Sequence, residues 1–195
     1  MKSIRINLQF LLAVLLMFAL SACSDDPPAQ GSLAYAQQEV QKVYPKAQVH
    51  EIDGLEVKLI YKDKRFSPEN VLRAGVDESE IRKDTIMILY GEPGGELQTV
   101  EKESVLPIEE LLYGPYSGTQ TLWLTLSELP AETREAETRS VDGVDMQVAH
   151  FEDGSLYATA RPGKVTYTLQ ANQSSGYEED ELLGILAQVS RIQGN

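Results

Sequence analysis

Hydrophobic and polar residues alternate along much of the second half of the chain, as they do in strands that bury one face. The alternating segments are residues 121–126, 144–150, 155–160 and 164–169. Turn dipeptides precede or separate the last three: Asp142-Gly143, Asp153-Gly154 and Pro162-Gly163. The pattern predicts an antiparallel meander with one apolar face.

Two hairpins are predicted before the meander. Residues 49–52 and 55–61 flank Asp53-Gly54, a dipeptide that tolerates the positive φ angles of a two-residue turn. In the second of these strands, period-two alternation would place three apolar side chains on one face: Val57, Leu59 and Tyr61. Residues 85–90 are almost continuously apolar, and the turn-forming stretch 91–95 would connect them to a strand at 97–100.

Helical periodicity predicts a helix at each end of the folded region. The first would begin after Ser32 as N-cap and end before Pro45, with its apolar stripe at Leu33, Ala36, Val40 and Val43. The last would start with a capping box from Ser175 to Glu178 and would cover the meander with Leu182, Ile185, Leu186, Val189 and Ile192. Residues 67–84 and 107–112 are also predicted to be helical in part, and 114–118 to be a loop.

These elements predict one α+β domain over residues 33–195. Its sheet would be curved and antiparallel, built from hairpins and the C-terminal meander, with the helices packed on one face. About 160 residues are enough for a single core of ordinary size.

The N-terminus has the three parts of an export signal. Lys2 and Arg5 precede eleven uncharged residues, 10–20, which are too few to span a hydrocarbon core that requires about 20. The following sequence, Leu20-Ser21-Ala22-Cys23, resembles the lipobox of bacterial lipoproteins. The resemblance implies cleavage between Ala22 and Cys23, and a diacylglycerol with fatty acyl chains such as palmitate on the Cys23 sulfur. The alternative is an ordinary secretory signal, 1–22, followed by a chance cysteine.

Residues 23–32 contain no large apolar side chain and predict a flexible tether. A flexible chain of this length spans on the order of 15–18 Å. The domain would therefore lie close to the extracytoplasmic face of the cell membrane, or of the outer membrane if the cell has one. Its partner would be the membrane itself, through the lipid on Cys23.

Charge and cysteine content exclude several classes of function. The formal net charge is −13, which disfavours nucleic acid as a partner because phosphate binding requires clustered Lys and Arg. Cys23 is the single cysteine, so once it is lipidated the domain has no disulfide, cysteine-ligated zinc or cysteine nucleophile. No cofactor-binding motif is present either.

The C-terminal half, from about Leu122 to Ile192, resembles a bacterial family of extracytoplasmic domains, the domain-of-unknown-function family 4367. The matching motifs are Val141-Asp142-Gly143-Val144, Asp153-Gly154, Val165-Thr166-Tyr167-Thr168-Leu169 and Glu179-Asp180-Glu181-Leu182-Leu183. Such domains occur in lipoproteins and in the outer parts of membrane-bound anti-sigma regulators. The resemblance implies a fold and a location, and it carries no catalytic residues.

Candidate catalytic and metal residues are few. His50 and His150 are the only histidines, and neither belongs to an HExxH pattern; positions at a sheet edge are the simpler interpretation. The acidic run 178–181 could bind calcium, but favourable charge at a helix N-terminus explains it more simply. Glu109-Glu110 and the acids in 132–137 could supply a carboxylate pair for glycoside hydrolysis, although nothing in the sequence places them in a cleft. No metal site is predicted.

Trp123 is the most promising recognition residue. It shares a predicted strand face with Thr121 and Thr125, opposite the core-facing leucines, and Tyr113 and Tyr116 could extend the patch. A Trp123 covered by a second layer is the alternative. The sequence thus predicts a non-catalytic module that binds or senses a protein, peptide or envelope component. A carrier with an apolar cavity between sheet and helices is the rival, and a cell-wall hydrolase a third hypothesis.

Overall fold

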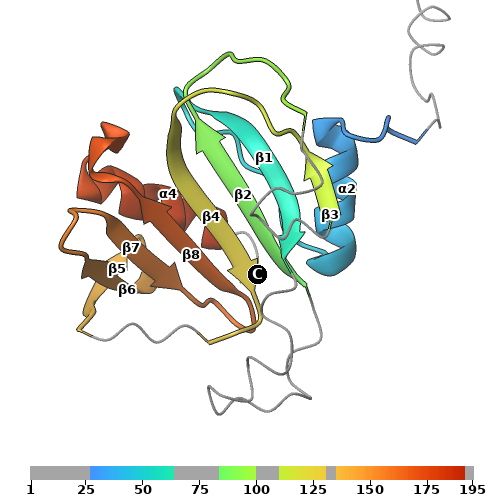
Figure 1. Ribbon diagram of the computed structural model, residues 1–195. Coiled ribbons are helices and arrows are strands. Elements are labelled where there is room, and N and C mark those ends of the chain that lie inside the picture. Colours follow the sequence, from blue (N-terminus) through green and yellow to red (C-terminus); the bar gives the residue numbers. More distant parts are fainter. Residues whose placement is uncertain (1–26, 64–83, 100–109, 131–134, 192–195) are drawn as a thin grey trace, which may run out of the picture.

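A computed structural model describes residues 27–63, 84–99, 110–130 and 135–191 (Figure 1). The described strands form one antiparallel sheet of eight, in the order β3-β1-β2-β4-β8-β7-β6-β5. Their bounds are β1 (Glu56–Asp63), β2 (Thr85–Gly91), β3 (Glu110–Tyr113), β4 (Gln120–Ser127), β5 (Glu137–Val141), β6 (Val144–His150), β7 (Leu156–Ala160) and β8 (Thr166–Ala171). The predicted α+β class with an antiparallel sheet is confirmed.

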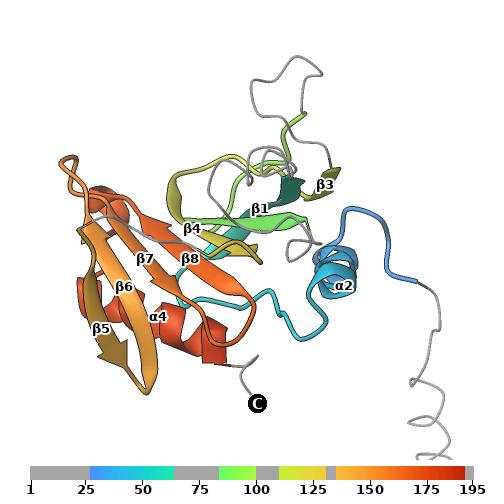
Figure 2. The ribbon, with the colours of Figure 1, turned by 90° about the horizontal axis from the view of Figure 1, so that it is seen from below.

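Two α-helices contribute to a single core on one face of this sheet. Helix α2 (Leu33–Val43) adds Ala36 and Val40, and helix α4 (Glu179–Arg191) adds buried residues such as Leu183 and Leu186. Figure 2 shows α4 lying along the meander and α2 beside the other half of the sheet. Ser32 caps α2 as predicted, because its hydroxyl accepts a hydrogen bond of 3.1 Å from the Tyr35 amide.

The meander is confirmed, and β5 extends it at the edge. Strands β6, β7 and β8 lie where the alternation places them, and β4 pairs with β8. Strand β5 is joined to β6 through the tight Asp142-Gly143 turn, in which both residues have positive φ. None of its residues is fully buried, so it carries no apolar alternation from which it could be predicted.

The two predicted N-terminal hairpins are wrong. Residues 49–52 form no strand, and the Asp53-Gly54 turn closes only a single bridge between Ile52 and Leu55. Strand β1 pairs instead with β2 and β3, while β2 pairs with β1 and β4. The physical reason is burial. Almost every residue of β2 is buried, so this strand needs a hydrogen-bonded partner strand on each side.

The predicted helix at 107–112 is also wrong for its described part. Residues 110–112 belong to β3, where Leu112 is buried in the main core and Leu111 emerges on the other face. Two adjacent leucines are compatible with a short edge strand as well as with a helical turn. The segment forms a strand because it can pair with the edge of β1 that β2 leaves free. The helix predicted over 67–84 lies outside the described residues, apart from Asp84, which precedes β2.

The capping box of the last helix lies three residues later than predicted. Ser175 belongs instead to a 3-10 turn, Gln173–Ser175. The N-cap is Glu178, whose carbonyl accepts the first helical bond from Leu182 and whose amide donates to the Glu181 carboxylate at 2.9 Å. The predicted capping box used Glu178 as its third helical residue, and the observed one uses Glu181. In both cases a carboxylate three residues after the N-cap accepts the hydrogen bond from the N-cap amide.

A β-bulge at Lys58 changes which side chains of β1 share a face. The pairing of β1 with β2 shifts register between Val57 and Leu59. As a result Val57 packs against the main core, whereas Leu59 and Tyr61 lie on the opposite face with Leu89. The prediction that Val57, Leu59 and Tyr61 share one face is therefore wrong.

Candidate functional site

The face of the sheet turned away from both helices carries a second apolar cluster. Figure 1 looks onto this face, with α4 behind the sheet. We call it the open face and define it by Leu59, Tyr61, Met87, Leu89, Trp123, Thr125, Tyr157, Thr168 and Gln170. Leu59, Tyr61 and Leu89 are nearly buried, whereas Trp123 is 39% exposed. An aromatic side chain of this size, half in contact and half accessible, is typical of recognition surfaces.

Strand register arranges the open face in two rows that cross the sheet. One row runs through paired residues from β1 to β7: Leu59, Leu89, Trp123, Gln170 and Tyr157. The neighbouring row contains Tyr61, Met87, Thr125, Thr168 and Thr159. The chemical character of the side chains changes in the same way along both rows. The residues on β1 and β2 are largely apolar, and those on β4, β8 and β7 carry aromatic, amide and hydroxyl groups.

Two adjoining hollows follow these rows. One, of about 230 Å³, is lined by Leu59, Tyr61, Met87, Ile88, Leu89, Gln120 and Trp123. The other, of about 320 Å³, is lined by Thr85, Met87, Trp123, Thr125, Ser127, Leu129, Pro130, Tyr157, Thr168 and Gln170. Met87 and Trp123 line both, so the hollows adjoin each other over β2 and β4. No charged side chain of the described residues lines either one.

The sequence places Trp123 on the correct face. Leu122, Leu124 and Leu126 point into the main core and are at most 2% exposed, so Trp123 and Thr125 must point the other way. Neither helix covers Trp123, because both helices contribute to the main core on the opposite face.

Tyr113 and Tyr116 do not extend the Trp123 patch. Their rings lie 5.2 Å apart and contact each other at the end of β3. Tyr113 pairs with Ile60 and packs against the main core, on the face opposite Trp123, and β1 and β2 separate β3 from β4. Among the described residues, Tyr61 and Tyr157 are the aromatic residues that share the open face with Trp123. Alternation places each on this face, but their position beside Trp123 depends on the strand order.

A third hollow, a cleft of about 280 Å³, lies beside α4 on the other side of the sheet. It is lined by His50, Glu51, Ile52, Asp53, Tyr177, Glu181, Ile185, Gln188 and Val189. The Tyr177 hydroxyl donates to the Asp53 carbonyl at 2.7 Å, and the Tyr90 hydroxyl donates to the His50 carbonyl at 3.1 Å. These bonds fix the segment before β1 against α4 and β2. His50 therefore lies in this connecting segment, and the prediction that it lies in a strand is wrong.

Burial lowers the pKa of His50 below its usual value. The unfolded chain therefore binds a proton near pH 6.5 that the folded chain does not yet bind, and the free energy of unfolding should fall as the pH drops below about 6.5. Above that pH the contribution is constant. We expect His50→Gln to reduce this slope in urea unfolding measured at about pH 7.5 and pH 6.0. An unchanged slope in His50→Gln would contradict the assignment.

The acidic run at the start of α4 is occupied by ion pairs. Arg139 on β5 contacts Glu179 at 3.0 Å and Asp180 at 3.3 Å, and His150 on β6 lies 3.2 Å from Glu179. Glu181 accepts the capping bond. These contacts tie the edge of the meander to the helix N-terminus, which supports the structural interpretation of the run. Within the described ranges, no three His, Cys, Asp or Glu residues form a group that could hold a metal ion.

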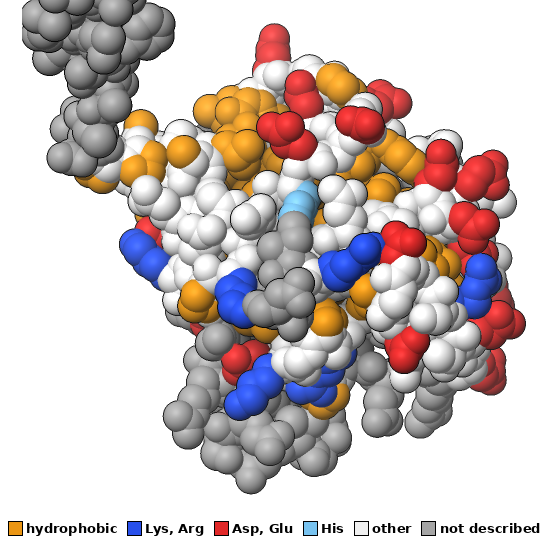
Figure 3. Space-filling model, turned by 180° about the vertical axis from the view of Figure 1, so that it is seen from behind, with side chains coloured by type: hydrophobic (Ala, Val, Ile, Leu, Met, Phe, Trp, Pro, Cys, Tyr) orange, Lys and Arg blue, Asp and Glu red, His pale blue; other side chains and the backbone are white. Residues whose placement is uncertain are grey.

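The carboxylate pairs suggested for glycoside hydrolysis lie largely outside the described residues. Glu109 and residues 132–134 are not described, and of the remaining acids Glu135 and Glu137 flank the start of β5. Figure 3 shows acidic side chains gathered at the top and along one side of the helix-bearing face.

Comparison with family models, curated proteins and solved structures gave no match. The resemblance to family 4367 stays a prediction. Among the described residues, neither helix has the length and apolarity that are required to cross a bilayer.

Proposed function

We propose that the protein is a lipid-anchored, extracytoplasmic binding or sensing module without catalytic activity, and that the open face binds its partner. The observation that carries the proposal is the accessible Trp123, which lies between two hollows whose described lining is uncharged, on a face that neither described helix covers. Buried aromatic anchors with a polar surround are the usual centres of protein recognition.

The anchor is part of the proposal. Cys23, acylated after removal of residues 1–22, would hold the domain at the membrane, and α2 begins only ten residues later. A flexible tether of this length spans on the order of 15–18 Å on average, so the domain would lie close to the bilayer surface. The partner would therefore be a protein, peptide or envelope component that reaches or surrounds the membrane.

The described hollows favour a surface module over a carrier. A carrier would require a cavity between sheet and helices, but that space is occupied by the main core, in which Ile60, Leu124 and Leu186 are at most 2% exposed. The three hollows described above lie elsewhere. A hydrolase would require paired carboxylates in a cleft, and the described lining of the open face contains none. The cleft beside α4 is lined by Glu51, Asp53 and Glu181, of which Glu181 accepts the helix-capping bond.

Site-directed photo-cross-linking in intact cells tests the proposal. A benzophenone amino acid at Gln170 would lie on the open face between Trp123 and Tyr157, whereas one at Gln188 would project from α4 on the other side. We expect light-dependent adducts of the full-length protein from position 170 and not from position 188. Equal adducts from both positions, or adducts from position 188 alone, would place the binding surface elsewhere.

A further inference from the structure

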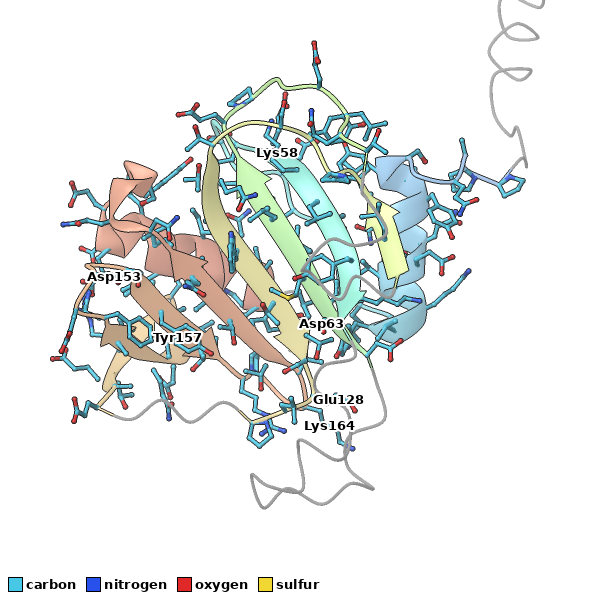
Figure 4. All side chains as sticks on the ribbon, in the orientation of Figure 1. Lys58, Asp63, Glu128, Asp153, Tyr157 and Lys164 are labelled. Carbon is cyan, nitrogen blue, oxygen red and sulfur yellow. The ribbon has the colours of Figure 1, made fainter. Side chains whose placement is uncertain are left out.

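Two aromatic side chains face the same hollow from strands that are not neighbours. Trp123 on β4 and Tyr157 on β7 are both paired with Gln170 on β8, which lies between them in the row. Neighbouring strands are about 4.8 Å apart, so the two aromatic residues are about 10 Å apart across the sheet. Figure 4 labels Tyr157 on this face, over the meander.

Hydroxyl and amide groups fill the space around these two rings. Thr125 pairs with Thr168 in the next row, and Ser127 and Thr85 line the same hollow of about 320 Å³. Together with Gln170 they offer uncharged hydrogen-bond donors and acceptors beside the aromatic rings. The hollow therefore combines flat apolar surfaces with neutral polar groups.

Phe151 supports the position of the Tyr157 ring. The two ring centroids are 6.0 Å apart with planes inclined at 75°, an edge-to-face contact. Phe151 is itself 49% exposed, so the aromatic surface continues past Tyr157 toward the edge of the sheet. Tyr157 thus has a packing partner that holds its ring beside the hollow.

We propose that this part of the open face binds an extended, uncharged, β-1,4-linked polysaccharide of the cell envelope. The faces of a sugar ring are apolar and its rim carries hydroxyl groups, which matches the two kinds of group in the hollow. In an extended β-1,4-linked chain every second ring presents the same face, and one disaccharide unit is similar in length to the distance from Trp123 to Tyr157. The inference rests on the proposed function, because it assigns a ligand to the same surface.

Charge distinguishes this ligand from others. The chain has 30 acidic and 17 basic residues, yet none of the described residues that line the hollow is charged. Against this described lining, a charged ligand group would lose hydration without gaining an oppositely charged partner, which disfavours anionic polymers and cationic peptides. A purely apolar ligand would leave the Thr125, Thr168 and Gln170 side chains without hydrogen bonds.

Binding is tested with soluble oligosaccharides and the full-length lipidated protein in phosphatidylcholine vesicles. Trp123 is the single tryptophan, so its fluorescence reports on the hollow directly. We expect a saturable blue shift with chitohexaose or cellohexaose, both neutral and β-1,4-linked, and none with α-1,4-linked maltohexaose or anionic polygalacturonate. By calorimetry, Trp123→Ala and Tyr157→Ala should each weaken binding about tenfold or more, whereas Tyr157→Phe, which keeps the ring, should bind within about twofold of the wild type.

The possible outcomes distinguish a wrong ligand assignment from a wrong binding surface. Binding of neither neutral hexasaccharide, stronger binding of the anionic or α-linked chain, or binding that is insensitive to Tyr157→Ala would overturn the inference. If cross-linking from position 170 persists in cells under any of these results, the open face still binds a partner and only the glycan assignment fails. Loss of both would overturn the proposed function as well.

Discussion

Cys23→Ser is expected to release the protein from the membrane fraction completely or to leave the uncleaved precursor. Serine offers no thiol for the thioether link that the lipobox resemblance implies. Each buried CH₂ group of an acyl chain contributes about 0.8 kcal/mol, and two chains suffice for stable anchoring. Neither described helix can replace them, and the net charge of −13 disfavours adsorption on anionic lipid. Fractionation of cells, with detection of the protein in membrane and soluble fractions, measures the effect.

Ser24→Ala is the matched control, because it changes the adjacent side chain and keeps the thiol. It should remain in the membrane fraction. Mass spectrometry of the native protein should find a lipidated Cys23 as the first residue. Membrane retention of a Cys23→Ser protein from which residues 1–22 have been removed, or an intact Met1 on the native protein, would contradict the anchor and with it the extracytoplasmic location.

The sequence predicted the elements whose two faces differ. Strands β4, β6, β7 and β8 each bury one face, so period-two alternation reveals both the strand and its inward side. The two helices were predicted from a stripe and a cap for the same reason. Strand β2 gives no such contrast, because it is buried on both faces, and its partners β1 and β4 could not be inferred from the neighbouring turn signals.

The candidate site was predicted only at its centre. Alternation in β4 placed Trp123 on the open face, but the neighbours of Trp123 depend on pairings between distant segments. Gln170 reaches it through the β4–β8 ladder and Tyr157 through the β7–β8 ladder. Tyr113 and Tyr116 are closer to Trp123 in sequence and were grouped with it, yet the insertion of β1 and β2 between β3 and β4 separates them. Proximity along the chain is a poor guide when the strand order is not sequential.

The bulge at Lys58 links the fold to the open face. Without it, Leu59 and Tyr61 would keep the orientation of Val57 and point into the main core. Lys58 itself is 2% exposed and lies at the upper end of β1 in Figure 4. Its ammonium group donates to the Gly94 carbonyl and lies 3.7 Å from the Glu56 carboxylate, while its stem is enclosed by the loops that precede β3 and β4. The lysine therefore holds the bulge and the loops together.

Lys58→Ala is expected to lower the free energy of unfolding by about 3 kcal/mol, because it removes a buried stem and leaves a cavity. Lys58→Met keeps most of the stem and removes the charge. Glu56 and Gly94 are both exposed and can bind water instead, so this variant should cost only about 1 kcal/mol, close to one lost hydrogen bond. Urea unfolding of the two variants separates packing from charge.

Lys164, an exposed lysine before β8, provides the control for the loss of a positive charge. Lys164→Ala should change the free energy of unfolding by no more than about 0.5 kcal/mol. Trp123 fluorescence adds a second readout, because Leu59 and Trp123 line the same hollow. If the bulge sets the direction of Leu59, Lys58→Ala should shift the emission of Trp123 and Lys164→Ala should not. Equal costs for Lys58→Ala and Lys58→Met would show that the ammonium group, and not the stem, holds the bulge.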